Sequence, residues 1–202
     1  MISLIVAILL IILAISFNDG IRKHSQLLYI GMTLLSILAF WQIEATLFTP
    51  IRLGGLGFGI FYVVMLTGAL KHKSTLRIKL MKVRMEYSIL GFIAITPHAL
   101  YQLIKYLNGD ITIPILGIIA YSIMIPLFIT SFRVIRKKMT YQNWKTLQRF
   151  AYIVYIGLSI HLLLNSALPN LAVYIIEFAG YFTLKVIYEL KRYQRTKNKQ
   201  FE

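Results

Sequence analysis

Seven long apolar stretches, separated by short polar segments, dominate the chain. They are residues 1–17, 27–48, 53–70, 87–107, 111–132, 148–166 and 171–188. As a helix, each is about long enough to cross a hydrocarbon core of ~30 Å. The first has no Lys or Arg ahead of it and no A-x-A-like site behind it, so we interpret it as a span rather than a signal peptide. It is also the shortest, which leaves open a position at the periphery of the bundle. The pattern therefore predicts an all-α integral membrane protein with about seven transmembrane helices.

Composition supports this prediction and excludes several kinds of chemistry. Hydrophobic residues make up 58% of the chain and charged residues 14%, whereas soluble domains carry roughly 25% charged residues. There is no cysteine, and hence no thiolate metal site, disulfide or iron–sulfur cluster. The glycine-rich segment GGLGFG at 54–59 follows no strand and has no acidic partner downstream. It therefore predicts close helix packing, not a nucleotide-binding loop.

Basic residues are distributed unevenly between the two sets of loops. The loops at 18–26, 71–86 and 133–149, together with the C-terminal end, hold 20 of the 22 Lys and Arg residues. The loops on the other side hold only Arg52 and Lys105. By the positive-inside rule, the basic side is cytoplasmic in a cell membrane, with the N-terminus outside and the C-terminus inside. The net charge of +15 lies mostly in these loops, so we expect membrane lipid rather than nucleic acid as their partner.

Two histidines lie inside predicted spans at matching depth. His98 follows Glu86, the last cytoplasmic charge before its span, by 12 residues, and His161 follows Arg149 by 12 residues. At a rise of ~1.5 Å per residue, both imidazoles lie ~18 Å above the cytoplasmic edge. Ionisable groups at such depth indicate a functional site. Two facing imidazoles suit the two axial positions of a haem, whereas zinc normally needs three or four ligands.

Two segments resemble the ferric-reductase-like transmembrane domain superfamily. They are TSFRVIRKKMTYQNWKTLQRFAYIVYIGLSIHLLL at 130–164 and VRMEYSILGFIAITPHALYQLIKYL at 83–107. Within that superfamily the chain looks most similar to the haem-binding membrane subunit of bacterial methionine-sulfoxide reductase systems. The matching positions are Thr130, Ser131, Trp144, Leu147, Arg149, Tyr152 and His161 in the first segment, and Arg84, Gly91, His98 and Tyr101 in the second.

The resemblance implies a six-helix core within residues 27–190, preceded by an N-terminal span and loop at 1–26 and followed by a basic tail at 191–202. It implies one b-type haem ligated by His98 and His161. Gln148 replaces a histidine of the family pattern, which argues against a second haem and leaves ~20 Å of helix between Gln148 and His161. FMN or a quinone would have to bridge that gap.

The implied function is that of the haem-binding component of a membrane reductase system. Electrons would come from a cytoplasmic flavin, a flavin reductase or a membrane quinol, and would pass to ferric iron or a partner reductase at the outer face. Arg52 and Lys105 would pair with haem propionates or anchor the chain at the interface.

Two other classes of function remain open. A haem-free transporter or sensor would use the histidines and Glu177 as a polar pathway. A degenerate relative would keep the fold without redox activity. For Glu177 we expect proton acceptance, pairing with Arg52 or Lys105, or a hydrogen bond from a ligating histidine. For Glu44 an interfacial role is the simpler expectation.

Overall fold

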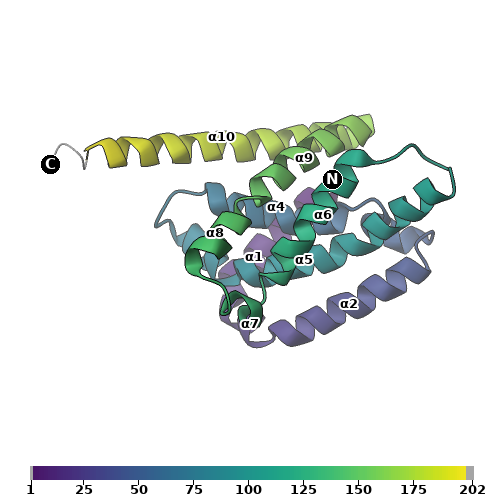
Figure 1. Cartoon of the computed structure of the whole chain (residues 1–202), viewed down its shortest axis with the longest axis horizontal. Helices are drawn as coiled ribbons and strands as arrows, with labels where there is room; N and C mark the ends of the chain where they lie inside the picture. The colour runs from purple at the N-terminus through teal and green to yellow at the C-terminus, as the bar shows by residue number, and fades with distance from the viewer. Residues whose placement is uncertain (1, 199–202) are drawn as a thin grey trace.

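The computed structural model describes residues 2–198, and all regular structure in that range is helical (Figure 1). The longer helices are α1 (Ile2–Lys23), α2 (Ser25–Trp41), α4 (Gly55–Ala69), α5 (Thr75–Leu107), α6 (Ile115–Ile129), α9 (Ala151–Asn165) and α10 (Leu168–Asn198). Short helices connect them: η1 (Thr46–Phe48), α3 (Thr49–Arg52), α7 (Arg133–Arg136) and α8 (Tyr141–Gln148). In Figure 1, α10 runs along one side of the bundle and extends beyond the other helices.

Not every helix is long enough to cross a membrane. Within residues 2–198, four helical segments reach that length and apolarity: Ile2–Lys23, Thr75–Leu107, Tyr141–Asn165 and Asn170–Gln194. A fifth forms if Thr46–Arg52 and Gly55–Ala69, which meet at a bend of 41°, count as one broken span. The remaining apolar helices, α2 and α6, have 17 and 15 residues. The prediction of an all-α membrane protein is confirmed, whereas the count of seven spans is not.

Helix α1 packs against the bundle along one face. It packs along both α4 and α5, and Ala7 and Ala14 are 1% and 0% exposed. Tyr87 of α5 donates a hydrogen bond to the main-chain oxygen of Leu10. Small side chains let this face of α1 approach its neighbours closely, while Ile5, Leu9 and Ile12 on the rest of the helix are exposed, so a position at the edge of the bundle agrees with the structure.

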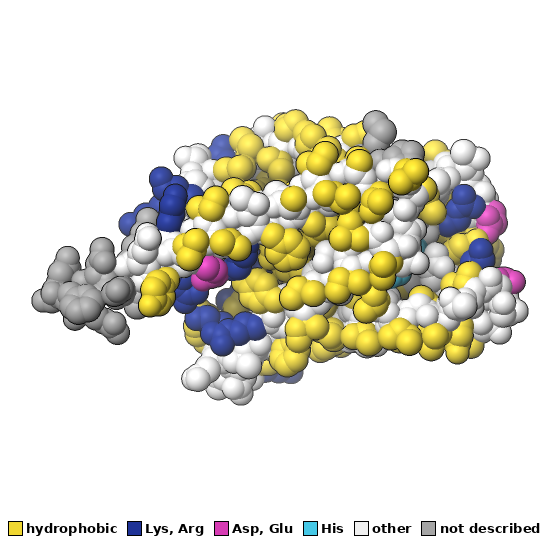
Figure 2. All heavy atoms as spheres, turned by 90° about the horizontal axis from the view of Figure 1, so that it is seen from above, with side chains coloured by type: hydrophobic (Ala, Val, Ile, Leu, Met, Phe, Trp, Pro, Cys, Tyr) yellow, Lys and Arg dark blue, Asp and Glu magenta, His cyan; other side chains and the backbone are white. Residues whose placement is uncertain are grey.

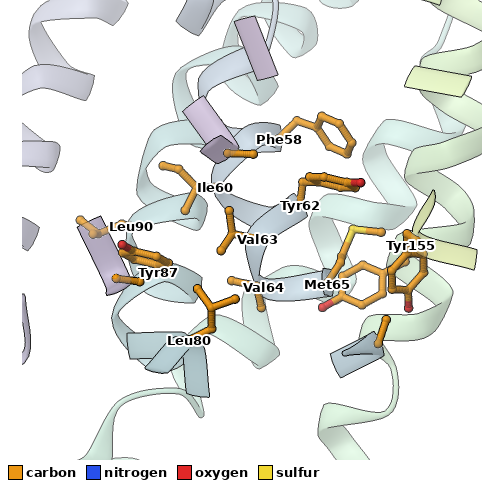
Figure 3. Close-up of a cluster of buried hydrophobic side chains, with 14 of the residues drawn as sticks. Phe58, Ile60, Tyr62, Val63, Val64, Met65, Leu80, Tyr87, Leu90 and Tyr155 are labelled. Carbon is orange, nitrogen blue, oxygen red and sulfur yellow. The ribbon is translucent and has the colours of Figure 1, made fainter. Parts of the chain in front are cut away.

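Helix α4 stands at the centre of the largest hydrophobic cluster. Figure 3 shows its side chains directed outward on several sides, with Tyr87 and Leu90 of α5 on one side and Tyr155 of α9 on the other. The glycines predicted to allow close packing do so. A methyl group at Gly57 would lie 2.8 Å from Ile95 Cβ of α5, and one at Gly59 would lie 2.7 Å from the main-chain oxygen of Ser3 in α1. Close packing by the glycine-rich segment is confirmed.

Helix α5 continues through Pro97 because α2 bonds a carbonyl group that the proline leaves free. Pro97 has no N–H to donate to the main-chain oxygen of Ile93, four residues earlier. The Ser36 hydroxyl of α2 donates to that oxygen at 3.1 Å. The helix therefore carries His98 without a break immediately after the proline.

Charge is segregated between the two ends of the bundle. In Figure 2, Lys and Arg side chains gather at the end from which α10 projects, and acidic side chains appear beside basic ones at the other end. We call these the basic end and the opposite end. The basic end holds the C-terminal end of α1, the start of α5 and the α7–α8 segment. The opposite end holds Glu44, Arg52 and Lys105.

Candidate functional site

His98 is anchored by one ring nitrogen. Its Nδ1 lies 2.6 Å from the main-chain oxygen of Arg52, at the end of α3. A carbonyl oxygen can only accept, so Nδ1 carries the proton and Nε2 keeps its lone pair. Such a bond to the second nitrogen is typical of histidines that ligate metals. Gly54, with φ +74°, follows Arg52 closely, and a methyl group there would lie 3.2 Å from His98 Cδ2.

His161 lies on α9, which packs along α6. A methyl group at Gly117 of α6 would lie 3.7 Å from His161 Cε1. Its ring makes no hydrogen bond to any residue in 2–198. The structure therefore leaves both ring nitrogens of His161 available to a ligand.

Ile95 of α5 and Leu158 of α9, which precede His98 and His161 by three residues, belong to the same hydrophobic cluster. No group of three or more His, Asp or Glu side chains in the described part of the chain could hold a metal ion. A metal bound by these two histidines would need its other ligands from a cofactor. A porphyrin supplies four nitrogens and two axial positions, so the donor set fits a haem.

A polar cluster at the opposite end holds the segment that carries the Arg52 carbonyl. The Arg52 guanidinium lies 2.6 Å from Glu44 Oε2, and the Tyr101 hydroxyl donates to Glu44 Oε1. These two contacts, the hydrogen bond from Tyr101 first, lower the pKa of Glu44 below its ordinary value of 4.5. The Lys105 ammonium lies over the Tyr101 ring, 5.5 Å from its centre.

This cluster changes the interpretation of Arg52 and Glu44. The Arg52 side chain is engaged by Glu44, so a propionate would have to share or displace that carboxylate. Glu44 is part of the support for His98 through Arg52. Contact of Arg52 and Lys105 with propionates stays a prediction.

Glu177 lies elsewhere in the bundle. Its side chain is 0% exposed, and its Oε2 accepts a hydrogen bond from Ser3 of α1 at 3.1 Å. Tyr62 of α4 donates to its main-chain oxygen at 3.0 Å. The expected pairing with Arg52, Lys105 or a histidine is absent from residues 2–198, because Glu177 faces α1 and Arg52 pairs with Glu44. Its Oε1 has no hydrogen-bond partner in that range, so proton acceptance by Glu177 stays a prediction.

Gln148 is held near the basic end. Its Nε2 donates to the Thr130 hydroxyl at 3.3 Å, and Trp144 Nε1 donates to the Thr130 main-chain oxygen at 3.2 Å. These bonds join α8 to the end of α6. The amide at the replaced histidine position therefore has a structural partner.

The helical fold and its long apolar helices define an all-α membrane protein. Residues 53–159 match the family described as ferric reductase like transmembrane component, which covers more than half of the chain. The chain belongs to this family. His98 lies within the matched residues, and His161 lies two positions beyond them.

A relative gives less detail about function. The chain is 25% identical over 213 residues to an uncharacterized protein of Treponema pallidum (strain Nichols). The alignment covers 94% of this chain and 59% of that protein, so the chain spans about three-fifths of its length. No solved structure matches the chain at a significant level.

Three parts of the site were not predicted from the sequence. They are the Arg52 carbonyl group as partner of His98, the glycines Gly54 and Gly117 beside the two rings, and the hydrogen bond from Tyr101 to Glu44. Gly54 belongs to the glycine-rich segment 54–59, for which close packing was predicted. Its position directly after Arg52 and Leu53 was the available signal that this part of the chain lies close to another helix.

Proposed function

We propose that the chain is the haem-carrying component of a membrane electron-transfer system, with one b-type haem between His98 and His161. The observation that carries this proposal is the bond from His98 Nδ1 to the Arg52 oxygen at 2.6 Å, which leaves Nε2 free toward a metal. The haem would supply one-electron chemistry.

The chain's own residues would hold and shield the cofactor. His98 and His161 would provide the axial nitrogens, and the absence of a side chain at Gly54 and Gly117 would leave room beside the rings. Apolar side chains of α5, α6 and α9 form a cluster that includes Phe92, Ile95 and Leu158. Such surroundings exclude water and favour the less charged state of a redox centre.

We propose that the helices make seven crossings with the basic end in the cytoplasm. In this arrangement α2 and α6, each shorter than a full span, would cross a locally thinned membrane. Electrons would enter from a flavin or flavin reductase at the basic end or from a quinol, and leave at the opposite end to ferric iron or a partner reductase. An apolar cavity of about 410 Å³ between α2 and α5, lined by Thr33, Thr96 and Pro97, would suit a quinol ring.

Electron paramagnetic resonance of the full chain, purified in detergent from cells supplied with haem, tests the proposal. Two imidazole ligands predict a low-spin ferric signal, and replacement of either ligand predicts a high-spin signal or loss of haem. Absence of any haem signal would favour the haem-free transporter or sensor. A haem that neither flavin nor quinol reduces would favour the degenerate relative.

A further inference from the structure

The basic end contains a cavity of about 570 Å³ between the end of α1, the first half of α5 and the α7–α8 segment. Five of its lining side chains are cationic: Arg22, Lys82, Arg133, Arg136 and Lys137. Glu86 is the one carboxylate among the lining residues. The cavity is therefore positively charged, which favours an anionic ligand.

Three of the cations already have acidic neighbours. Asp19 lies 3.9 Å from Arg22 and 3.7 Å from Lys82, and Glu86 Oε1 lies 3.8 Å from Arg133. Glu86 is 1% exposed, and among the described residues neither of its carboxylate oxygens has a hydrogen-bond partner, so Arg133 is its one cationic neighbour at ion-pair distance. In the part of the chain that the structure describes, Arg136 and Lys137 form no ion pair.

Arg136 is held ready for an anion. Its guanidinium stacks on the Trp144 ring, 4.0 Å from the ring centre. The ring is itself fixed, because Trp144 Nε1 donates to the Thr130 main-chain oxygen. Stacking leaves the in-plane N–H groups of a guanidinium free, and these suit the oxygens of a phosphate.

The remaining lining indicates a lipid rather than a soluble phosphate. Met81, Met85 and Met139 contribute apolar surface to the cavity. Met81 is 46% exposed, and Val134 of α7, outside the cavity, is 72% exposed. Trp144 and Tyr141 are of the type that collects at membrane–water interfaces. A phosphate in the cavity could therefore continue into acyl chains that lie against the helices.

We propose that this cavity binds the headgroup of an anionic phospholipid of the phosphatidylglycerol class, with Arg136 and Lys137 contacting the phosphate. The site does not depend on the haem. It would fix the α7–α8 segment against α5 at the membrane surface.

Native mass spectrometry of the full-length protein in detergent tests this site by titration with phosphatidylglycerol, with phosphatidylcholine of the same acyl chains, and with glycerol phosphate. The informative variant is Arg136→Ala with Lys137→Ala. The control is Lys71→Ala with Lys191→Ala, which removes the same charge from exposed positions outside the cavity. The midpoint of thermal unfolding of both variants checks that they are folded, and Arg136→Lys provides a milder substitution.

We expect phosphatidylglycerol to bind more tightly than phosphatidylcholine. Loss of each charged contact should weaken its binding about tenfold or more, while the control keeps wild-type affinity. Arg136→Lys should give an intermediate loss, because an ammonium cannot reproduce the guanidinium fork. Equal losses in both double variants would overturn the site in favour of general attraction to a basic surface. Glycerol phosphate that binds as tightly as the lipid would overturn the lipid as ligand and indicate a soluble phosphate compound.

Discussion

His98 Nδ1 donates a hydrogen bond to the main-chain oxygen of Arg52 at 2.6 Å, and this bond joins the middle of α5 to the short helix α3. The α3 segment is in turn fixed by the ion pair between Arg52 and Glu44 and by the hydrogen bond from Tyr101 to Glu44. The orientation of the proposed ligand therefore depends on contacts made at the end of the bundle.

The first prediction concerns the residue beside the His98 ring. Gly54→Ala should lower the haem content of purified protein, because its methyl group would lie 3.2 Å from His98 Cδ2 and its φ of +74° disfavours any other residue. Haem per chain, measured as the pyridine haemochrome, checks this. Gly68→Ala, on the helix α4 that begins directly after Gly54, is the control, since nothing lies within 4 Å of that position. Equal haem content in both variants would contradict the role of Gly54.

The second prediction concerns packing between α1 and α4. Gly59→Ala should destabilise the protein by about 1–3 kcal/mol, as expected for overpacking against main chain. Its methyl group would lie 2.7 Å from the main-chain oxygen of Ser3 and 2.9 Å from Val6 Cβ. Thermal unfolding in detergent, followed by circular dichroism, measures the loss. Gly68→Ala should be neutral or slightly stabilising, and a Gly59→Ala protein as stable as that control would contradict close packing at this site.

The sequence predicted some of these features because their signals are local. Glycines spaced two apart in an apolar helix indicate close packing, and Gly57 and Gly59 show it. The equal depth of His98 and His161 comes from counting residues along two helices and stays a prediction.

The features that were not predicted depend on which helices pack together in the folded chain. The Arg52 carbonyl group is 46 residues from His98 and looks like any other carbonyl in the sequence. Ser3 and Glu177 are 174 residues apart, and their contact follows from how α1 packs against the bundle. A short N-terminal stretch carries no sign of which helices it will contact.

The third prediction concerns acid pH. The folded protein holds Glu44 ionised, with a pKa below 4.5, so its contribution to stability is complete above pH 4.5 and is lost as pH falls through the lower folded value. Wild-type protein should therefore lose stability in this range as the Arg52 contact weakens. Glu44→Gln should lack this step, while remaining less stable than wild type near neutral pH. The midpoint of thermal unfolding, measured from about pH 3 to about pH 7 so that the range includes the ordinary carboxylate pKa, reports both effects. An identical pH profile for the two proteins would contradict the role of Glu44.

The fourth prediction concerns a second haem. Gln148→His restores the histidine of the family pattern, yet it should not add a haem. The matching region of α5 holds Arg84 and Met85, so no second imidazole faces the new one. The substitution should also weaken the link between α8 and α6, because Gln148 bonds Thr130. The ratio of haem to chain, from haemochrome and protein assays, should stay at its wild-type value; a doubled ratio would contradict a single-haem arrangement.

The central claim is that His98 and His161 hold one haem, and the absorption spectrum of the purified full-length protein tests it most directly. Protein from cells supplied with haem is measured oxidised and after dithionite reduction, beside His98→Ala and His161→Ala. A Soret band that shifts on reduction, with sharp α and β bands that disappear in both variants, is the predicted result. A featureless wild-type spectrum, or a spectrum unchanged in either variant, would contradict the assignment of these two histidines as the haem ligands.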